Sequence, residues 1–224
     1  MRIPKNFNNL RGKKVLITAG PTREYWDPVR YISNASSGAM GVAIAQEARS
    51  LGAHVTLVLG PVSVPVPRPQ KDLQVIRVVS ALDMETAVKD NLDGTQVFVG
   101  AAAVADYRPE DAVKRKLKED DPEITLRLVR NPDIIAHVAR RSPHRPPVVI
   151  GFALETHDLL QNAAEKMKRK GLDWIVANPD SNIGQRRGTA KLLSRWGEQI
   201  SLGKMPKTDM AKRIWEALLE RPAL

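Results

Sequence analysis

The sequence predicts an α/β fold in which a mostly parallel sheet has helices on both faces and a β-hairpin follows near the C-terminal end. Short apolar runs rich in Val and Ile alternate along most of the 224 residues with stretches of helical periodicity. Gly or Pro residues bound these runs, which is typical of buried strands. Strands that alternate with helices form parallel sheets covered on both sides. We therefore expect a single Rossmann-like domain.

The first half of the chain is predicted to contain a βαβ unit, followed by a further strand and helix. Ser80 can cap the second helix, because Asp83 stands at the position that completes a capping box. The expected elements are a strand at 14–20, a helix at about 38–51, a strand at 54–60, a strand at 75–79 and a helix after Ser80.

The second half continues the alternation and ends in the hairpin. Asn131 is the expected N-cap of one helix with Pro132 at its first position, Gly197 marks the hairpin turn, and Thr208 is the expected cap of the last helix. The expected elements are a long strand at 97–107, a helix at 132–141, a strand at 148–155, a helix at 159–170, a strand at 174–179, a hairpin at 190–203 and a helix at 209–220.

The amino-acid composition favours some classes of ligand and excludes some kinds of site. The 35 Lys and Arg residues exceed the 25 acids and give a net charge of +10, which favours nucleic acid, acidic membrane surfaces or small polyanions as ligands. The absence of Cys excludes disulfides, a Cys nucleophile and thiolate metal sites. No apolar run is long enough to span a membrane, so we expect a cytoplasmic protein. Residues 1–11 are polar and aperiodic, as in a tail or a linker remnant, which leaves 12–224 as the domain.

A charged loop is expected at 108–123, after the strand at 97–107. It holds five basic residues, six acids and two prolines but few apolar anchors, which indicates a mobile loop. Its position places it at the carboxyl edge of the sheet, where open α/β folds bind ligands. A basic mobile segment at that edge suggests a lid.

The stretch "DPVRYISNASSGAMG" at 27–41 joins the first strand to its helix. A long insertion separates Gly20 from the later glycines, so the compact dinucleotide fingerprint is missing and an ordinary dehydrogenase is disfavoured. Ser36, Ser37 and Gly38 stand at a helix N-terminus, where free N–H groups and the helix dipole attract phosphate or carboxylate. Capping by the serines and close packing by the glycines are the alternative. Arg30 and Asn34, an anion-binding fork and a neutral donor, favour the anion site.

Several motifs occur in order between about residue 12 and about residue 179. They are "ITAGPTREYWDPVRYISNASSGAMG", "GAAAVADYRP", "KLK", "NPDI" and "GFALET". Together they resemble the bacterial phosphopantothenate–cysteine ligases. The resemblance implies a single nucleotide-binding ligase domain that joins 4′-phosphopantothenate to L-cysteine in coenzyme A synthesis. CTP activates the substrate as an acyl-cytidylate, so pyrophosphate and then CMP are released.

The resemblance also implies cofactors and partners. Mg²⁺ accompanies the triphosphate, and no flavin is expected on this chain. A homodimer is expected, together with a flavin-dependent decarboxylase that is either fused or separate.

The resemblance implies three catalytic residues. Asn34 would steady the acyl-cytidylate and the oxyanion formed when the cysteine amine attacks, and Arg30 would act at the substrate carboxylate or phosphate. Lys116 would neutralise the α-phosphate as pyrophosphate leaves. Glu119 stands where the family's lid motif usually has a lysine, and Lys114 and Arg115 could compensate. A turn role for Asn34 and a surface salt bridge for Arg30 are the alternatives.

The implied CTP pocket is assembled from strand ends and helices. Its alanines could equally serve packing, its Asp133 could be a favourable first-turn acid, and its two lysines could form a solvated helix face. Besides Lys116, the CTP-contacting residues are Gly100, Ala101, Ala102, Asp106, Pro132, Asp133, Ile134, Ile135, Phe152, Lys166 and Lys170.

Two other classes remain as alternatives. A nucleic-acid-binding protein fits the sequence pI of about 10, although aromatic residues are only 4% and no nucleic-acid motif is present. A nicotinamide- or flavin-dependent oxidoreductase fits a Rossmann-like sheet, although the compact glycine fingerprint of such enzymes is missing here. The residues alone leave open the choice between CTP and ATP, the metal ligands, the dimer geometry and whether the chain is an excised domain.

Overall fold

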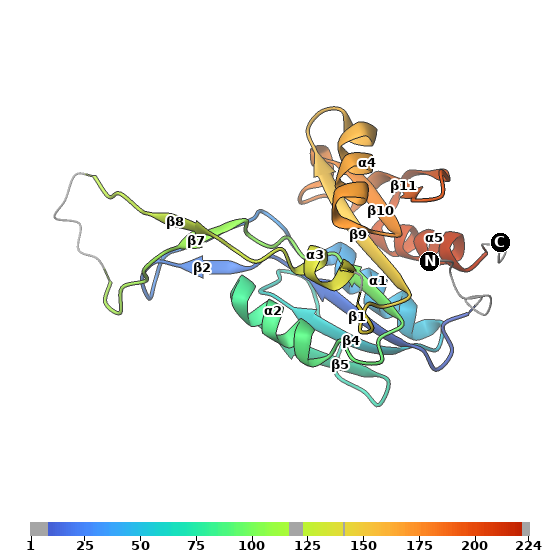
Figure 1. Cartoon of the computed structure of the whole chain (residues 1–224), viewed down its shortest axis with the longest axis horizontal. Helices are drawn as coiled ribbons and strands as arrows, with labels where there is room; N and C mark the ends of the chain where they lie inside the picture. Colours follow the sequence, from blue (N-terminus) through green and yellow to red (C-terminus); the bar gives the residue numbers. More distant parts are fainter. Residues whose placement is uncertain (1–8, 117–122, 141, 221–224) are drawn as a thin grey trace.

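A computed structural model describes residues 9–116, 123–140 and 142–220, and it confirms the expected fold class (Figure 1). Its main sheet has eight strands in the order β12-β11-β10-β9-β6-β1-β4-β5. The six strands from β10 to β5 are parallel, and β11 and β12 are antiparallel to their neighbours. The bounds are β1 Lys14–Ala19, β4 His54–Leu59, β5 Leu73–Arg77, β6 Val97–Gly100, β9 Val148–Glu155, β10 Trp174–Pro179, β11 Arg187–Ser194 and β12 Gln199–Pro206.

The parallel part has the strand order of a Rossmann fold. From β1 the chain moves outward to β4 and β5, and then crosses back to β6, β9 and β10 on the other side of β1. Both faces of the central strands are covered, which is why β1 is buried at every position after Lys14. The chain therefore reverses its direction across the sheet between β1 and β6, where ligands bind in open α/β folds.

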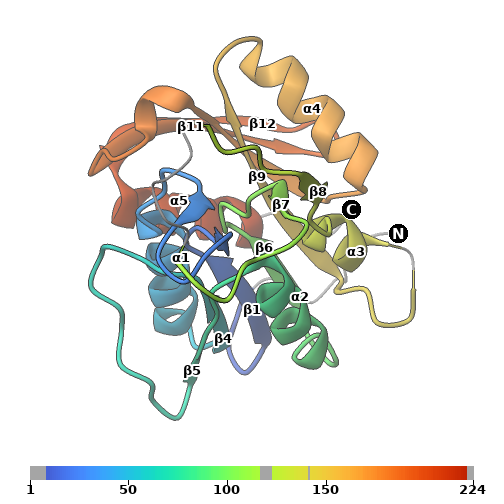
Figure 2. The ribbon, with the colours of Figure 1, turned by 90° about the vertical axis from the view of Figure 1, so that its left-hand side faces the viewer.

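The five helices of the described residues form two layers around the sheet. Helices α1 and α5 share one core with one face of the strands, and α2, α3 and α4 share a second core with the other face. Figure 2 shows the strands β11 and β12 between α4 on one side and α5 on the other. The bounds are α1 Ala39–Ser50, α2 Ala81–Asp90, α3 Ile134–Ala139, α4 Leu159–Lys170 and α5 Lys207–Leu219. None of these helices is long and apolar enough to cross a membrane.

Local predictions at two helices and the hairpin have different outcomes. The capping box of α2 is confirmed, since the Ser80 hydroxyl accepts from Asp83 N at 3.1 Å and the Asp83 carboxylate accepts from Ser80 N at 2.9 Å. The hairpin of β11 and β12 is confirmed with Gly197 at φ 94° in its turn, and it is longer than expected. The cap at Thr208 is wrong, because α5 begins two residues earlier than expected, at Lys207, after Pro206 and without a side-chain cap.

The predicted strand at 97–107 is wrong beyond Gly100. There the chain leaves the sheet, and Ala101 N donates to the carbonyl oxygen of Thr18. The predicted N-cap Asn131 is also wrong. The side chain that caps α3 is that of Asp133, which accepts from Ala136 N.

Two short strand pairs form an arm beside the main sheet. In Figure 1 the strands β2, β7 and β8 extend away from the sheet at the left. No pattern in the sequence predicted β2 or β3, and the loop predicted at 108–123 is wrong at its start, which lies in β7. The bounds are β2 Arg23–Tyr25, β3 Tyr31–Ser33, β7 Tyr107–Pro109 and β8 Leu128–Arg130.

The packed part of the chain also begins before residue 12. The side chain of Leu10 is fully buried in the core shared by α1 and α5. Its carbonyl oxygen accepts from Lys13 N at 2.9 Å, which fixes the turn into β1. Leu10 and the turn that follows it therefore belong to the packed part of the chain.

Candidate active site

The crevice between β1 and β6 is built from the loops that follow these strands. Ala103 N donates to the carbonyl oxygen of Gly20 at 2.9 Å, and Ala105 N donates to the hydroxyl of Thr22 at 3.0 Å. These bonds hold the segment 101–106 against the chain that leaves β1. Because both strands end here, the backbone of two loops and one helix N-terminus meet at the carboxyl edge of the sheet.

The glycines of this region serve close packing. Gly38 has φ 77°, and a Cβ there would lie 2.2 Å from Val62 Cγ1. A Cβ on Gly41 would lie 2.4 Å from Ala19 Cβ, so α1 approaches β1 as closely as the backbone allows. The structure thus shows the packing role that the sequence offered as the alternative for these glycines.

The serines leave the N-terminus of α1 without a firm cap. Ser36 Oγ accepts from Gly38 N at 3.3 Å and Ser37 Oγ accepts from Ala39 N at 3.4 Å, both long for hydrogen bonds. Gly38, the N-cap residue, contributes no side-chain bond. The first-turn N–H groups of α1 therefore stand at the crevice in the position predicted for an anion site, which remains a prediction.

Asn34 connects the base of the arm to the loop after β6. Its Nδ2 donates to the carbonyl oxygens of Ala103 and Val104 at 3.1 and 3.0 Å. Both amide N–H bonds are used in this way, so a donation to a substrate oxygen requires the exchange of one of them. The structure therefore gives Asn34 a loop-holding contact that the sequence did not suggest.

Arg30 lies in the turn between β2 and β3 and is paired with Asp27. Its Nη1 stands 3.2 Å from Asp27 Oδ2, and Asp27 Oδ1 accepts from the backbone N–H groups of Val29 and Arg30. The salt bridge is not a surface one, because the Asp27 side chain is fully buried. The extended strand β3 separates the backbones of Arg30 and Asn34 by roughly 13 Å along the chain, so the two residues stand at opposite ends of this strand.

A second polar cluster lies where α4 packs near α3. The ammonium group of Lys170 stands 2.9 Å from Asp133 Oδ2 and 3.0 Å from Oδ1. Lys166 lies one helical turn earlier, and the carboxylates that influence it are those of Glu155, Asp106 and Asp133. The structure thus brings together four of the predicted CTP residues.

In this cluster the pKa of Lys166 and the pKa of Asp133 are both lowered, for different reasons. Burial lowers the pKa of Lys166, and the nearby charge of Lys170 adds to this, while the three carboxylates oppose it. For Asp133, burial acts to raise the pKa, but the hydrogen bonds from Lys170 and Ala136 N outweigh it and lower the pKa. Lys166 makes no hydrogen bond or ion pair within the described part of the chain. It is therefore the cation of this cluster that an anionic ligand can pair with most directly.

The apolar members of the predicted CTP set fall on both faces of the sheet. Ile135 covers the end of β6, since a Cβ on Gly100 would lie 2.7 Å from Ile135 Cδ1. Phe152 and Ala101 pack instead against the core of α1 and α5. Ile134 is only 6% exposed and points into the core of α2, α3 and α4, so its side chain is not available to a ligand in this arrangement. Ala102 packs beside that second core, and Pro132 is half-buried just before α3.

Lys116 is not brought to either cluster. It is exposed and lies outward of the pair β7 and β8, three residues after Val113, whose N–H donates to the carbonyl oxygen of Trp26. Lys114 and Arg115 precede it and are also exposed. Lys118 and Glu119 lie outside the described residues.

Asn131 and Arg108 are positioning residues that the sequence did not reveal. Asn131 Nδ2 donates to the carbonyl oxygen of Ala105 at 2.9 Å, and Asn131 N donates to that of Asp106 at 2.8 Å. Arg108 Nη1 donates to Asn131 Oδ1 at 3.2 Å. The Asn before a Pro was visible in the sequence, but its pairing with a loop 26 residues earlier was not.

No group of three or more His, Asp or Glu side chains in the described part of the chain could hold a metal ion. A Mg²⁺ ion that arrives with a triphosphate needs only one or two protein carboxylates, because phosphates and water complete its shell. Asp106 is exposed and lies at the edge of the crevice.

The Rossmann strand order, the crevice between β1 and β6 and the lysines beside it define a class: an α/β protein with a mostly parallel, Rossmann-like sheet and a polar crevice at its carboxyl edge. Within that class, the chain belongs to the family described as the DNA/pantothenate metabolism flavoprotein C-terminal domain, whose model matches residues 10–221. This finding confirms the relationship expected from the motifs.

Individual relatives agree with this assignment. The chain is 50% identical over 217 residues to the coenzyme A biosynthesis bifunctional protein CoaBC of Vibrio cholerae, which covers 95% of this chain and 53% of that protein. It thus spans about half the length of that relative. A crystal structure of the C-terminal domain of CoaBC matches with a TM-score of 0.79 and 36% identity over 95% of this chain and 97% of that one. A Cab2 variant in complex with phosphopantothenate-cysteine shares the fold at 16% identity, with a TM-score of 0.69 over 94% and 88% of the two chains.

Proposed function

We propose that this chain is a phosphopantothenate–cysteine ligase domain of coenzyme A biosynthesis. It would join 4′-phosphopantothenate to L-cysteine and use CTP through an acyl-cytidylate. The observation that carries the proposal is the match to the C-terminal domain of CoaBC, which extends over 95% of this chain and 97% of that one. The flavin-dependent decarboxylase expected as a fused or separate partner is part of the same proposal, since the chain spans 53% of its Vibrio relative.

The crevice at 101–106 and the cluster of Lys166, Lys170 and Asp133 suggest where each of the two chemical steps takes place. In the first step a carboxylate oxygen of the substrate attacks the α-phosphorus of CTP, and the bond to pyrophosphate breaks. Lys166 and Lys170 offer positive charge for the triphosphate beside the crevice, and Mg²⁺ enters with it. Their helix face is not simply solvated, because Lys170 is paired with Asp133 and burial lowers the pKa of Lys166.

In the second step the cysteine amine attacks the acyl carbonyl, loses a proton, and the bond to CMP breaks. The carbonyl oxygen carries the developing negative charge. Asn34 donates to the loop 101–106, and the first-turn N–H groups of α1 stand at the same crevice. We therefore place the acyl group at this crevice. Asn34 either exchanges a bond to serve as donor or acts by holding the loop.

The central experiment measures pyrophosphate release with phosphopantothenate, cysteine, Mg²⁺ and each nucleoside triphosphate in turn. We expect CTP to support turnover and to raise the melting temperature more than ATP or NAD, since a ligand of the folded state stabilises it according to its occupancy. Equal responses to all nucleotides would remove CTP from the proposal. Absence of the phosphopantothenoylcysteine product with every nucleotide would remove the ligase activity itself.

The variant Asn34→Asp separates the two roles of Asn34. A single turnover of pyrophosphate with acyl-cytidylate trapped after acid quench would place Asn34 in the second step. Loss of pyrophosphate release together with weaker CTP binding would indicate that it holds the loop of Ala103 and Val104. Product formation near the wild-type rate would show that the side chain has neither role.

The homodimer expected from the family is also a proposal, and the arm supports it. Large apolar side chains are exposed along the arm, which is typical of a surface that a second copy covers. They are Val29, Tyr31, Tyr107, Val113, Ile124 and Leu128, each between 39% and 57% exposed. Sedimentation equilibrium of wild type and of Ile124→Asp tests this: a monomeric wild type at micromolar concentration would refute the dimer.

A further inference from the structure

A cavity lies at the end of the sheet opposite to the crevice. Its volume is about 710 Å³, within the range of small-molecule sites. It is bounded by the chain before β9, the C-terminal ends of α3 and α4, and the end of β11, so it is separate from the candidate active site. The residues that line it are Ala139, Ser142, Arg145, Ala164, Met167, Lys168, Gly171, Leu172 and Arg195.

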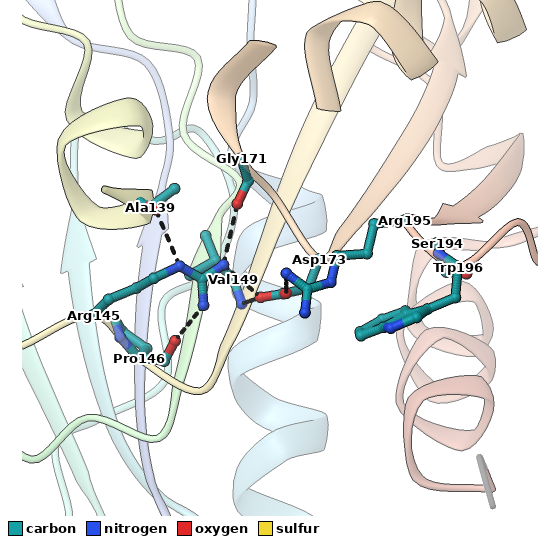
Figure 3. A network of polar contacts seen from close by, with 9 residues as sticks. All are labelled: Ala139, Arg145, Pro146, Val149, Gly171, Asp173, Ser194, Arg195 and Trp196. Carbon is teal, nitrogen blue, oxygen red and sulfur yellow. Dashed lines mark hydrogen bonds and ion pairs between the residues drawn. The ribbon is translucent and has the colours of Figure 1, made fainter. Parts of the chain in front are cut away.

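A network of ion pairs among Arg145, Asp173 and Arg195 (Figure 3) lies beside this cavity, and the two arginines belong to its lining. Arg145, whose side chain is 6% exposed, donates to the carbonyl oxygens of Ala139, Pro146 and Gly171 and to the carboxylate of Asp173. Asp173 also pairs with Arg195 at 3.1 Å. A guanidinium has five N–H bonds. On Arg145, four of these N–H bonds have acceptors among the described residues, and one N–H on Nη1 has none there.

The lining separates into an apolar floor and a positive rim. Met167, Leu172 and Ala139 are each less than 10% exposed, so they form the floor. Lys168 is exposed, and the Arg195 side chain is 30% exposed, so their charged groups stand at the rim. Among the described residues that line the cavity there are three cations and no acid, and Asp173, which pairs with two of these cations, is not part of the lining.

We propose that this cavity binds a small organic phosphate, with an aliphatic part on the floor formed by Met167 and Leu172 and its dianion among Lys168, Arg195 and Arg145. An alkyl group alone would make no ion pair with the positive rim, and a bare phosphate would make no apolar contact with the floor. An amphipathic anion satisfies both parts of the lining. This inference does not rest on the proposed ligase function.

The test is a titration of the whole ¹⁵N-labelled chain with n-butyl phosphate, followed by NMR. We expect amide shifts concentrated at 142–145 and 167–172, and tighter binding than for inorganic phosphate or n-butylamine, which each lack one half of the ligand. Shifts confined to the crevice, or equal affinity for all three probes, would overturn the proposal.

Two variants and a matched control locate the site. Lys168→Gln removes a rim charge and should weaken binding of n-butyl phosphate by about threefold to tenfold. Ala164→Leu fills the cavity and should weaken binding to a similar extent while keeping an apolar lining. Lys212→Gln makes the same change of charge on the exposed side of α5 and should leave the affinity unchanged. Equal affinities for all three variants would refute the assignment.

Discussion

The variant Asp173→Asn tests the buried network that joins β9, β10 and the end of β11. Asp173 is 1% exposed and accepts from Val149 N at 2.8 Å, from Arg145 Nη2 at 2.9 Å and from Arg195 Nη1 at 3.1 Å. The substitution keeps the shape of the side chain but removes its charge. It also turns one acceptor oxygen into an NH₂ group that faces a donor.

The expected loss of stability depends on how deeply each arginine that pairs with Asp173 is buried. Removing one partner of a buried ion pair costs about 3–5 kcal/mol, because the remaining charge stays buried without compensation. Arg145 is in that position, with a side chain 6% exposed, whereas Arg195 is 30% exposed and can turn toward water. We therefore expect the lower end of this range, a loss of about 3 kcal/mol in the free energy of unfolding. For a chain of this size the melting temperature should fall by about 6–12 °C.

The assay is urea unfolding followed by tryptophan fluorescence and circular dichroism. Trp174 is a suitable probe, since it is buried at the start of β10, directly after Asp173. The control Asp93→Asn makes the same change at a side chain that is 95% exposed, and its unfolding midpoint should match that of wild type. A midpoint of Asp173→Asn equal to that of the control would refute the reasoning, because the carboxylate would then contribute nothing to the fold.

Three further predictions concern a helix cap and two lysines. Ser80→Ala should lower the free energy of unfolding by about 1 kcal/mol in urea titrations. The hydrogen bond from the backbone N–H of Ser80 is the main cause of the lowered pKa of Asp83. The stability that this carboxylate contributes is therefore complete above its ordinary pKa. It should be lost as the pH falls through the lowered pKa, below about pH 4. Lys166→Met should raise the unfolding midpoint, because burial lowers the pKa of Lys166 and the charged ammonium group is held at a cost in stability. That cost begins to fall as the pH rises through the lowered pKa and is gone above the ordinary pKa of a lysine. CTP binding, measured by calorimetry, should weaken about tenfold or more. Lys116→Gln should slow the pyrophosphate burst on the order of 10²-fold without changing the unfolding midpoint, because the side chain is exposed; an unchanged burst would assign that role to another basic residue.

The sequence by itself determined the class of the fold, most of its elements and the family. Alternation of apolar runs and helical stretches predicted the parallel strands, and the capping box at Ser80 and the turn at Gly197 were both confirmed. These signals depend on residues that are neighbours or a few positions apart, so the chain carries them before it folds. The ordered motifs indicated the family for the same reason, since each is a continuous stretch.

Only the tertiary structure decided how the strand after Val97 ends and which side chains meet. The end at Gly100 depends on bonds from 101–105 to the chain after β1, about 80 residues away in sequence. The same holds for Asn34 on the loop after β6, for Lys170 with Asp133 and for the two guanidiniums around Asp173. Each of these side-chain contacts joins residues 22 to 70 positions apart, and the distance between the residues is set by how whole helices and strands pack rather than by any local preference.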